Sequence, residues 1–159
     1  MGRTIRPVTA ADESWVVEFI DRRWGAPYVI GHGQLYYPNT LPGFVAEVDG
    51  EPVGLLTYHV DGLDWEIVTI DSLEPSSGIG SELIFALRQE AIRAGARRLW
   101  LITTNDNLNA LRFYQKRGFR LVAVHPDALD RSRQLKPNIP LVGQDGIPLR
   151  DELELELLL

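Results

Sequence analysis

Apolar side chains recur at helical spacing in two segments of this chain. Residues 10–24 carry them at Trp15, Val16, Phe19, Ile20 and Trp24. Residues 81–96 carry Leu83, Leu87 and Ala91 four positions apart, and Ile84 joins the same face. Both patterns predict amphipathic helices, the second ending at Gly95. Thr9 or Asp12 is the expected N-cap of the first helix, and residues 3–8 form a short extended segment before it.

From Phe44 the pattern changes to that of strands. The runs 44–48, 52–60 and 63–73 are rich in β-branched and aromatic residues, and the pairs Asp49-Gly50 and Asp61-Gly62 separate them. An Asp-Gly pair between two such runs is a strong hairpin signal, because both turn positions favour positive φ. We therefore expect an antiparallel meander of three strands.

The remaining pattern predicts a sheet with helices packed on it. The apolar run 97–105 is expected to be a strand covered on both faces, so that the preceding strand, helix and this strand make a parallel crossover unit. A second helix over 107–118 ends at Gly118, and a strand follows at 119–125. Residues 128–136 are predicted to form one or two helical turns, and residues 137–148 are predicted to form a loop. The alternating run ELELELLL predicts a closing strand. Residues 25–42 have no clean period and suggest an irregular stretch with one short helix. The fold class is a mixed α/β (α+β) sheet, in one domain over residues 1–159.

Composition narrows the function classes. A formal charge of −6 argues against a nucleic-acid or membrane-surface partner. The absence of cysteine excludes disulfides, thiolate nucleophiles and cysteine-built zinc sites. The three histidines are dispersed, so no metal site is expected, and the acidic side chains of residues 151–156 are expected to form a solvated strand face. No signal-peptide pattern or long apolar run is present, which makes a cytoplasmic protein the expectation.

A glycine-rich turn lies between the last meander strand and the second helix. Gly78 and Gly80 there allow a sharp turn and close approach of a ligand, and free N–H groups at a helix start attract anions such as a pyrophosphate. The plainer interpretation is that a tight strand-to-helix turn needs glycine. A dinucleotide-binding domain is disfavoured, because Leu83 stands where its third glycine would be.

The order of motifs resembles the GCN5-related N-acetyltransferase (GNAT) superfamily. The turn Gly78-Ile79-Gly80 is followed by an Asn-x-x-Ala and Tyr-x-x-x-Gly-Phe pattern, carried by Asn107, Ala110, Tyr114, Gly118 and Phe119. The resemblance covers about residues 44–124 and implies two central parallel strands that splay apart around the pantetheine arm of acetyl-CoA or CoA. Pro75 departs from the family pattern, since it stands where an arginine or glutamine precedes the glycines.

The resemblance also implies which residues bind the co-substrate. Backbone groups of the splayed strand, the amides and hydroxyls of the glycine turn, and the second helix would contact it. These candidates are Asp71, Ser72, Leu73, Ser77, Gly78, Ile79, Gly80, Ser81, Glu82, Asn107, Ala110 and Tyr114.

Transfer of an acyl group to an amine needs a base for the ammonium and an acid for the departing thiolate. The resemblance makes Glu66 the candidate base, although an outward strand position would explain it equally well. It makes Tyr114 the candidate acid, against the alternative of a packed helix aromatic. His59 is a second-choice base, and Tyr36, Tyr37 and Trp24 either line an acceptor pocket or anchor a loop.

The chain is thus expected to move an acetyl group from acetyl-CoA to the amine of a small molecule or peptide. The alternative is a non-catalytic acyl-CoA-binding sensor of the same fold. The sequence leaves open the acceptor, the length of the acyl group, and whether the protein is a monomer or a homodimer.

Overall fold

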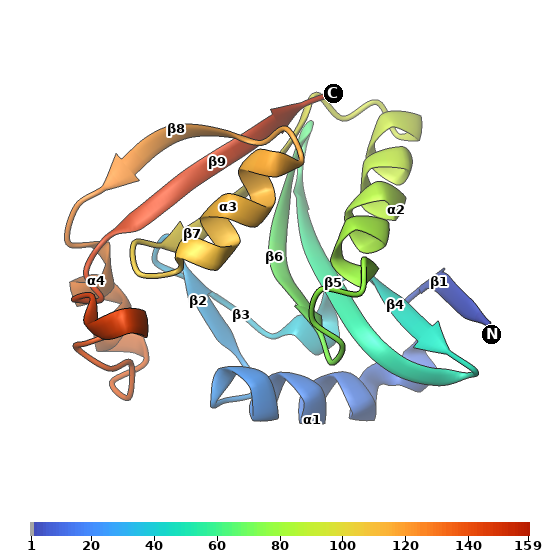
Figure 1. Cartoon of the computed structure of the whole chain (residues 1–159), viewed down its shortest axis with the longest axis horizontal. Helices are drawn as coiled ribbons and strands as arrows, with labels where there is room; N and C mark the ends of the chain where they lie inside the picture. The colour runs from blue at the N-terminus through green and yellow to red at the C-terminus, as the bar shows by residue number, and fades with distance from the viewer. Residues whose placement is uncertain (1) are drawn as a thin grey trace.

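A seven-stranded sheet with helices on both faces makes up the structure, a computed structural model that describes residues 2–159 (Figure 1). The strands follow the order β1-β4-β5-β6-β7-β9-β8, and β2 pairs with β3 in a separate small sheet. The strands are β1 (Arg3–Pro7), β2 (Val29–Gly31), β3 (Gln34–Tyr36), β4 (Gly43–Val48), β5 (Glu51–Asp61), β6 (Asp64–Ser72), β7 (Arg98–Thr104), β8 (Arg120–His125) and β9 (Glu152–Leu158). The helices are α1 (Glu13–Trp24), α2 (Ile79–Arg93), α3 (Leu108–Lys116) and α4 (Ala128–Leu135). The predicted mixed α/β architecture is confirmed.

The predicted meander forms with its two hairpins. Strand β4 pairs antiparallel with β5, and β5 pairs antiparallel with β6. Asp49 and Gly50 have φ angles of 52° and 82°, the doubly positive backbone of a tight hairpin turn. The second turn has Gly62 at φ 62°.

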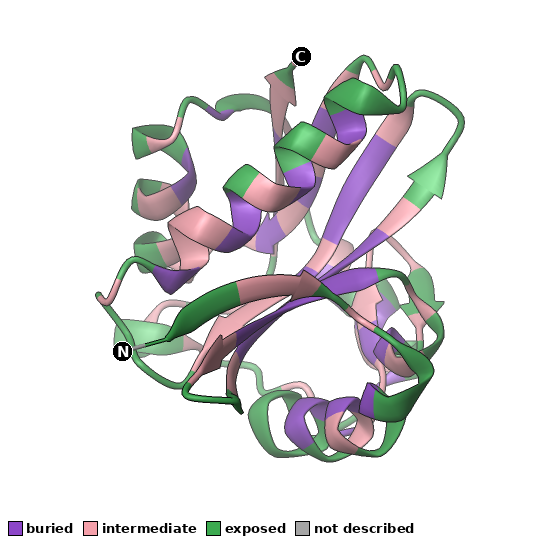
Figure 2. Ribbon diagram, turned by 90° about the vertical axis from the view of Figure 1, so that its right-hand side faces the viewer, coloured by how far each residue is buried: buried purple, intermediate pink, exposed green. Residues whose placement is uncertain are grey.

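Alternation along the meander strands separates two cores. Leu56 packs with α2 and α3, whereas its neighbour Leu55 packs with α1 on the opposite face of the sheet. Successive side chains of a strand point to opposite faces, so each strand supplies both cores. Figure 2 shows buried residues concentrated on the central strands, with the outer sides of the helices exposed. Over residues 2–159, none of the helices combines the length and the apolar character that crossing a bilayer would need.

The parallel pair at the centre of the sheet opens part of the way along. Strands β6 and β7 pair from Asp64 with Arg98 as far as Ile67 with Leu101. Beyond that point β6 continues beside β5 to Ser72, and β7 continues beside β9 to Thr104. The two strands therefore separate over their second halves, as the family resemblance implied.

Two expectations about exposure are wrong. Strand β7 alternates between buried and half-buried positions, so only one of its two faces is fully covered. Strand β9 lies between β7 and β8 in the sheet, and its acidic side chains are not simply solvated, because His32, His125 and Arg98 contact them. Leu155 is fully buried on one side, and Glu152 is only 3% exposed on the other.

The stretch 25–42 contains more order than its sequence suggests. Strands β2 and β3 form a hairpin whose turn contains His32 at φ 41° and Gly33 at φ 77°. A short 3-10 helix, Pro38–Thr40, supplies the one short helix that was expected. Strands of three residues are too short to show a period in the sequence, which is why the hairpin was not predicted.

Candidate functional site

Two cavities lie beside β6. The loop cavity, of about 640 Å³, is bounded by residues 70–81 and by α3. The hairpin cavity, of about 120 Å³, lies between the β2–β3 hairpin and the separated parts of β6 and β7. Ile67 and Val68 line the hairpin cavity, and Ile70 to Ser72 line the loop cavity. Strand β6 thus lines both cavities, around and beyond the point where its pairing with β7 ends.

The glycine turn forms one wall of the loop cavity. Gly78 has a φ of 89° and precedes α2, whose N-terminus has no side-chain cap. The first amides of an uncapped helix have no partner inside the helix and can bind an anion. A Cβ on Gly80 would come within 2.9 Å of Cζ of Phe113, so Gly80 is required for the contact between α2 and α3.

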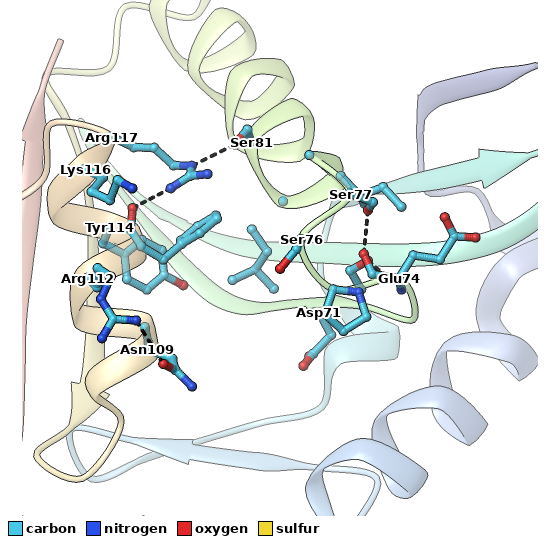
Figure 3. Close-up of a pocket in the computed structure, with 18 of the residues that line it drawn as sticks. Asp71, Glu74, Ser76, Ser77, Ser81, Asn109, Arg112, Tyr114, Lys116 and Arg117 are labelled. Carbon is cyan, nitrogen blue, oxygen red and sulfur yellow. Dashed lines mark hydrogen bonds between the residues drawn. The ribbon is translucent and has the colours of Figure 1, made fainter.

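Helix α3 brings cations to the same cavity. Arg112, Lys116 and Arg117 line it opposite the serines of the turn (Figure 3). Arg117 Nε donates to Ser81 Oγ at 2.8 Å, and its guanidinium lies 3.6 Å from the ring centroid of Phe113. The chain lacks an arginine or glutamine at position 75, and these side chains supply positive charge at the turn from another element.

Tyr114 lies on α3 between the core and the loop cavity. It is 7% exposed, packs against Phe113 and Phe119, and lines the cavity. Burial, and then the charge of Asp71, raise the pKa of Tyr114 above its usual value near 10, so the phenol stays protonated at neutral pH. Tyr114 therefore packs in the core and lines the cavity at the same time.

Asp71 is fixed on the opposite wall of the cavity. Trp24 Nε1 donates to Asp71 Oδ2 at 2.8 Å, and Arg23 Nε lies 3.7 Å from Asp71 Oδ1. Burial raises the pKa of Asp71 against the opposing effect of these two partners. The C-terminal end of α1 is thereby held against β6.

Glu66 is buried in the hairpin region, so the alternative that it is only an outward strand residue is wrong. It is only 4% exposed and lines the hairpin cavity. Tyr36 Oη donates to Glu66 Oε1 at 2.8 Å, and His32 Nε2 lies 3.1 and 3.0 Å from the two carboxylate oxygens. Two side chains of the β2–β3 hairpin therefore orient this carboxylate.

His32 links Glu66 to a second buried carboxylate. Its backbone N–H donates to Glu152 Oε2 at 3.2 Å, and its ring lies 5.2 Å from that of Trp100. The hydrogen bond with Glu66 raises the pKa of His32 above 6.5, although burial opposes the shift. Sequence spacing gave no signal for this contact, because residues 32, 66 and 152 are far apart in the chain.

Only some of the remaining residues predicted to bind the co-substrate line the loop cavity. Ser72, Ser77, Ile79, Ser81 and Ala110 line the loop cavity, whereas Asn107 caps α3 and lines the hairpin cavity. Leu73 and Glu82 are not among the lining residues, and the amide of Glu82 donates to Gly78 O at 3.1 Å within α2.

Of the candidate acceptor residues, only some gather near Glu66. Tyr36 lines the hairpin cavity with Trp24, and the ring of His59 lies 5.4 Å from that of Tyr36 without lining it. Tyr37 is 49% exposed and packs against Tyr28 outside both cavities.

Comparisons with known proteins agree with this architecture. A model of the Acetyltransferase (GNAT) family matches residues 10–119. Two proteins of Bacillus subtilis (strain 168), both described as uncharacterized, are similar in sequence: YdhI is 42% identical over 87% of each chain, and YxbD is 36% identical over 94% of each.

Solved structures share the fold at lower identity. An IAA acetyltransferase from Bacillus cereus ATCC 14579 superposes with a TM-score of 0.74 at 23% identity, covering 99% of this chain and 100% of that one. A GNAT family acetyltransferase from Elizabethkingia anophelis, with acetyl-CoA bound, superposes with a TM-score of 0.69 at 24% identity. The match covers 99% of this chain and 98% of that one.

Proposed function

The chain belongs to the GNAT family of acetyltransferases, and from this premise we propose that it transfers the acetyl group of acetyl-CoA directly to an amine. The observation that carries the proposal is the placement of two chemically suitable groups beside β6. Tyr114 lines the loop cavity, and Glu66 lines the hairpin cavity. A reaction centre between the separated strands would have an acid on one side and a base on the other.

Acetyl-CoA fits the residues of the loop cavity. The uncapped start of α2 offers amides of Ile79, Gly80 and Ser81 to the pyrophosphate, and Arg117 adds a charged donor. The separation of β6 from β7 after Ile67 leaves unpaired backbone groups on both strands, which suits an amide-containing pantetheine arm.

The two titratable groups then have distinct roles. Acetyl-CoA supplies a thioester, whose carbonyl carbon a neutral amine can attack. Glu66 takes one proton from the ammonium and leaves the neutral amine that attacks. The C–N bond then forms and the C–S bond breaks; the hydroxyl of Tyr114 gives its proton to the thiolate, and the second proton lost by the nitrogen returns to the resulting phenolate. An alkyl ammonium has a pKa of about 10, so a base is needed at neutral pH. His32 and Tyr36 orient Glu66 toward the cavity that the amine would enter.

The proposal is tested by following thiol release from acetyl-CoA across a panel of amines, with mass spectrometry of the products. Release of thiol together with an acetylated amine supports the transfer. Stabilisation of the fold by CoA, without an acetylated product from any amine, would instead favour the acyl-CoA-binding sensor.

A further inference from the structure

The hairpin cavity contains a second carboxylate that the proposed chemistry does not use. Glu152 lines it together with Glu66 and is only 3% exposed. A carboxylate removed from water to this extent is costly unless charges or donors compensate it. The partners of Glu152 therefore show whether its role is structural.

Glu152 has fewer partners than the other acidic residues of β9. Its Oε2 accepts the His32 amide at 3.2 Å, and within residues 2–159 its other oxygen has no hydrogen bond and no side-chain cation forms a salt bridge with it. Burial raises the pKa of Glu152, while the hydrogen bond from the His32 amide and the charges of His32, His125 and Arg131 oppose this shift. By contrast, Glu154 lies 3.1 Å from His125 Nε2, and Glu156 accepts from Arg98 at 2.8 Å.

The cavity is small and its lining is mixed, because Tyr36, Thr103, Thr104 and Asn107 add polar groups to its aliphatic walls. Val29, Ile30, Val68 and Ile102 contribute aliphatic side chains, and Trp24 contributes an aromatic one. With a volume of about 120 Å³, the cavity suits a compact group rather than a long peptide. A small cavity that combines aliphatic side chains with a buried carboxylate in no salt bridge is complementary to a compact organic ammonium.

We propose that Glu152 recognises the positive charge of the acceptor, so that the enzyme acetylates compact alkyl or arylalkyl amines and discriminates against amines that carry a neighbouring carboxylate. This inference rests on the proposed function and names its substrate class. A carboxylate on the acceptor would face both Glu66 and Glu152 in a site of low dielectric, where like charges repel strongly.

Matched acceptor pairs test the inference, since cadaverine and lysine, or histamine and histidine, differ only in the α-carboxylate. We expect the amine of each pair to react with a kcat/KM at least about 10-fold higher than the amino acid. In Glu152→Gln this preference should fall to below about threefold, mainly through a higher KM for the amine. Glutamine keeps an oxygen for the His32 amide, so the variant should fold.

Glu154→Gln is the matched control, because it removes the same charge from the same face of the same strand. That residue is already paired with His125 and does not line the cavity, so the preference should be unchanged. An equal preference in the parent and in Glu152→Gln, or an equal loss in both variants, would overturn the inference while leaving acetyl transfer intact.

A binding measurement separates this inference from the failure of the proposed function. Calorimetric titration of cadaverine and histamine into the CoA-saturated protein requires no turnover. Weaker binding of these amines by Glu152→Gln, by about 10-fold, supports recognition by Glu152 even if no thiol is released. Unchanged binding would overturn it.

Discussion

The imidazole of His32 contacts both carboxylate oxygens of Glu66, with Nε2 at 3.1 Å from Oε1 and 3.0 Å from Oε2. A carboxylate only accepts hydrogen bonds, so this nitrogen carries the proton. The side chain of His32 is 27% exposed, whereas that of Glu66 is 5% exposed. The imidazole therefore lies between the buried candidate base and the solvent, on a route by which a proton could leave.

Replacing the candidate base should remove its proton acceptor and keep its shape. We expect Glu66→Gln to bind acetyl-CoA normally and to lose most of its activity at neutral pH, by about 100-fold or more. Activity should return in part as the pH rises toward 10, because more of the amine is then neutral in solution. Rates of thiol release over pH 6 to 10 check this, and identical pH profiles for parent and variant would exclude Glu66 as the base.

The contact between His32 and Glu66 should also make folding stability depend on pH. The pKa of His32 is raised in the folded state, so the pair stabilises the protein fully below pH 6.5 and loses this contribution as the pH rises through the folded-state pKa. His32→Asn keeps a residue type that tolerates the φ of 41°. We expect it to lower the free energy of unfolding by about 1 kcal/mol at pH 5.5 and by less at pH 9.

Denaturant unfolding at the two pH values measures this difference. In a Glu66→Gln background the pH-dependent part should become smaller, because the main group that raises the pKa of His32 is gone, whereas Glu152 and Glu154 still raise it. A pH-independent loss in His32→Asn would mean that the side chain contributes only packing.

The sequence predicted the parts of the fold that carry a strong local signal. The Asp-Gly pairs predicted the meander, and Leu83, Leu87 and Ala91 predicted the face of α2 that packs on the sheet. The alternation of β9 predicted a strand, but exposure depends on which strands lie beside it. Glu152 was therefore expected to be solvated and is instead buried on the face of the sheet where His32 of the β2–β3 hairpin contacts it.

The candidate site was predictable only where one segment carries it. The glycine turn and Tyr114 lie in motifs of fixed spacing, and the structure brings them together at the loop cavity. His32 has no such signal, because a hairpin with three-residue strands positions it and its partners are 34 and 120 residues away. Long-range contacts of this kind depend on the whole topology, which spacing along the chain does not encode.

Binding of the CoA phosphates should depend on the cationic side chains of α3, because residues 74–81 of the glycine turn include no lysine or arginine. We expect Lys116→Gln and Arg117→Gln each to weaken CoA binding by about 3- to 10-fold, with a smaller dependence of affinity on salt. Arg88→Gln is the control, because Arg88 is exposed on α2 and does not line the loop cavity. Calorimetry with CoA at two salt concentrations measures the effect, and equal affinities in all three variants would contradict it. Gly80 is a poor test position, since a Cβ there would displace Phe113.

The proposed role of Tyr114 as an acid can be separated from its role in packing, because Tyr58 provides a matched control. Both tyrosines are buried in the same core, at 7% and 8% exposure, but only Tyr114 lines the loop cavity. Each tyrosine-to-phenylalanine change removes one hydroxyl. We expect Tyr114→Phe to keep its affinity for CoA and to reduce kcat by roughly 10- to 1,000-fold, the range usual for general acid catalysis. Tyr58→Phe should leave kcat unchanged.

Because burial raises the pKa of Tyr114 above 10, loss of its proton should not reduce the activity of the parent below about pH 10. Equal kcat values for the two variants, or a fall in kcat matched by a fall in CoA affinity, would assign Tyr114 to packing rather than to proton transfer.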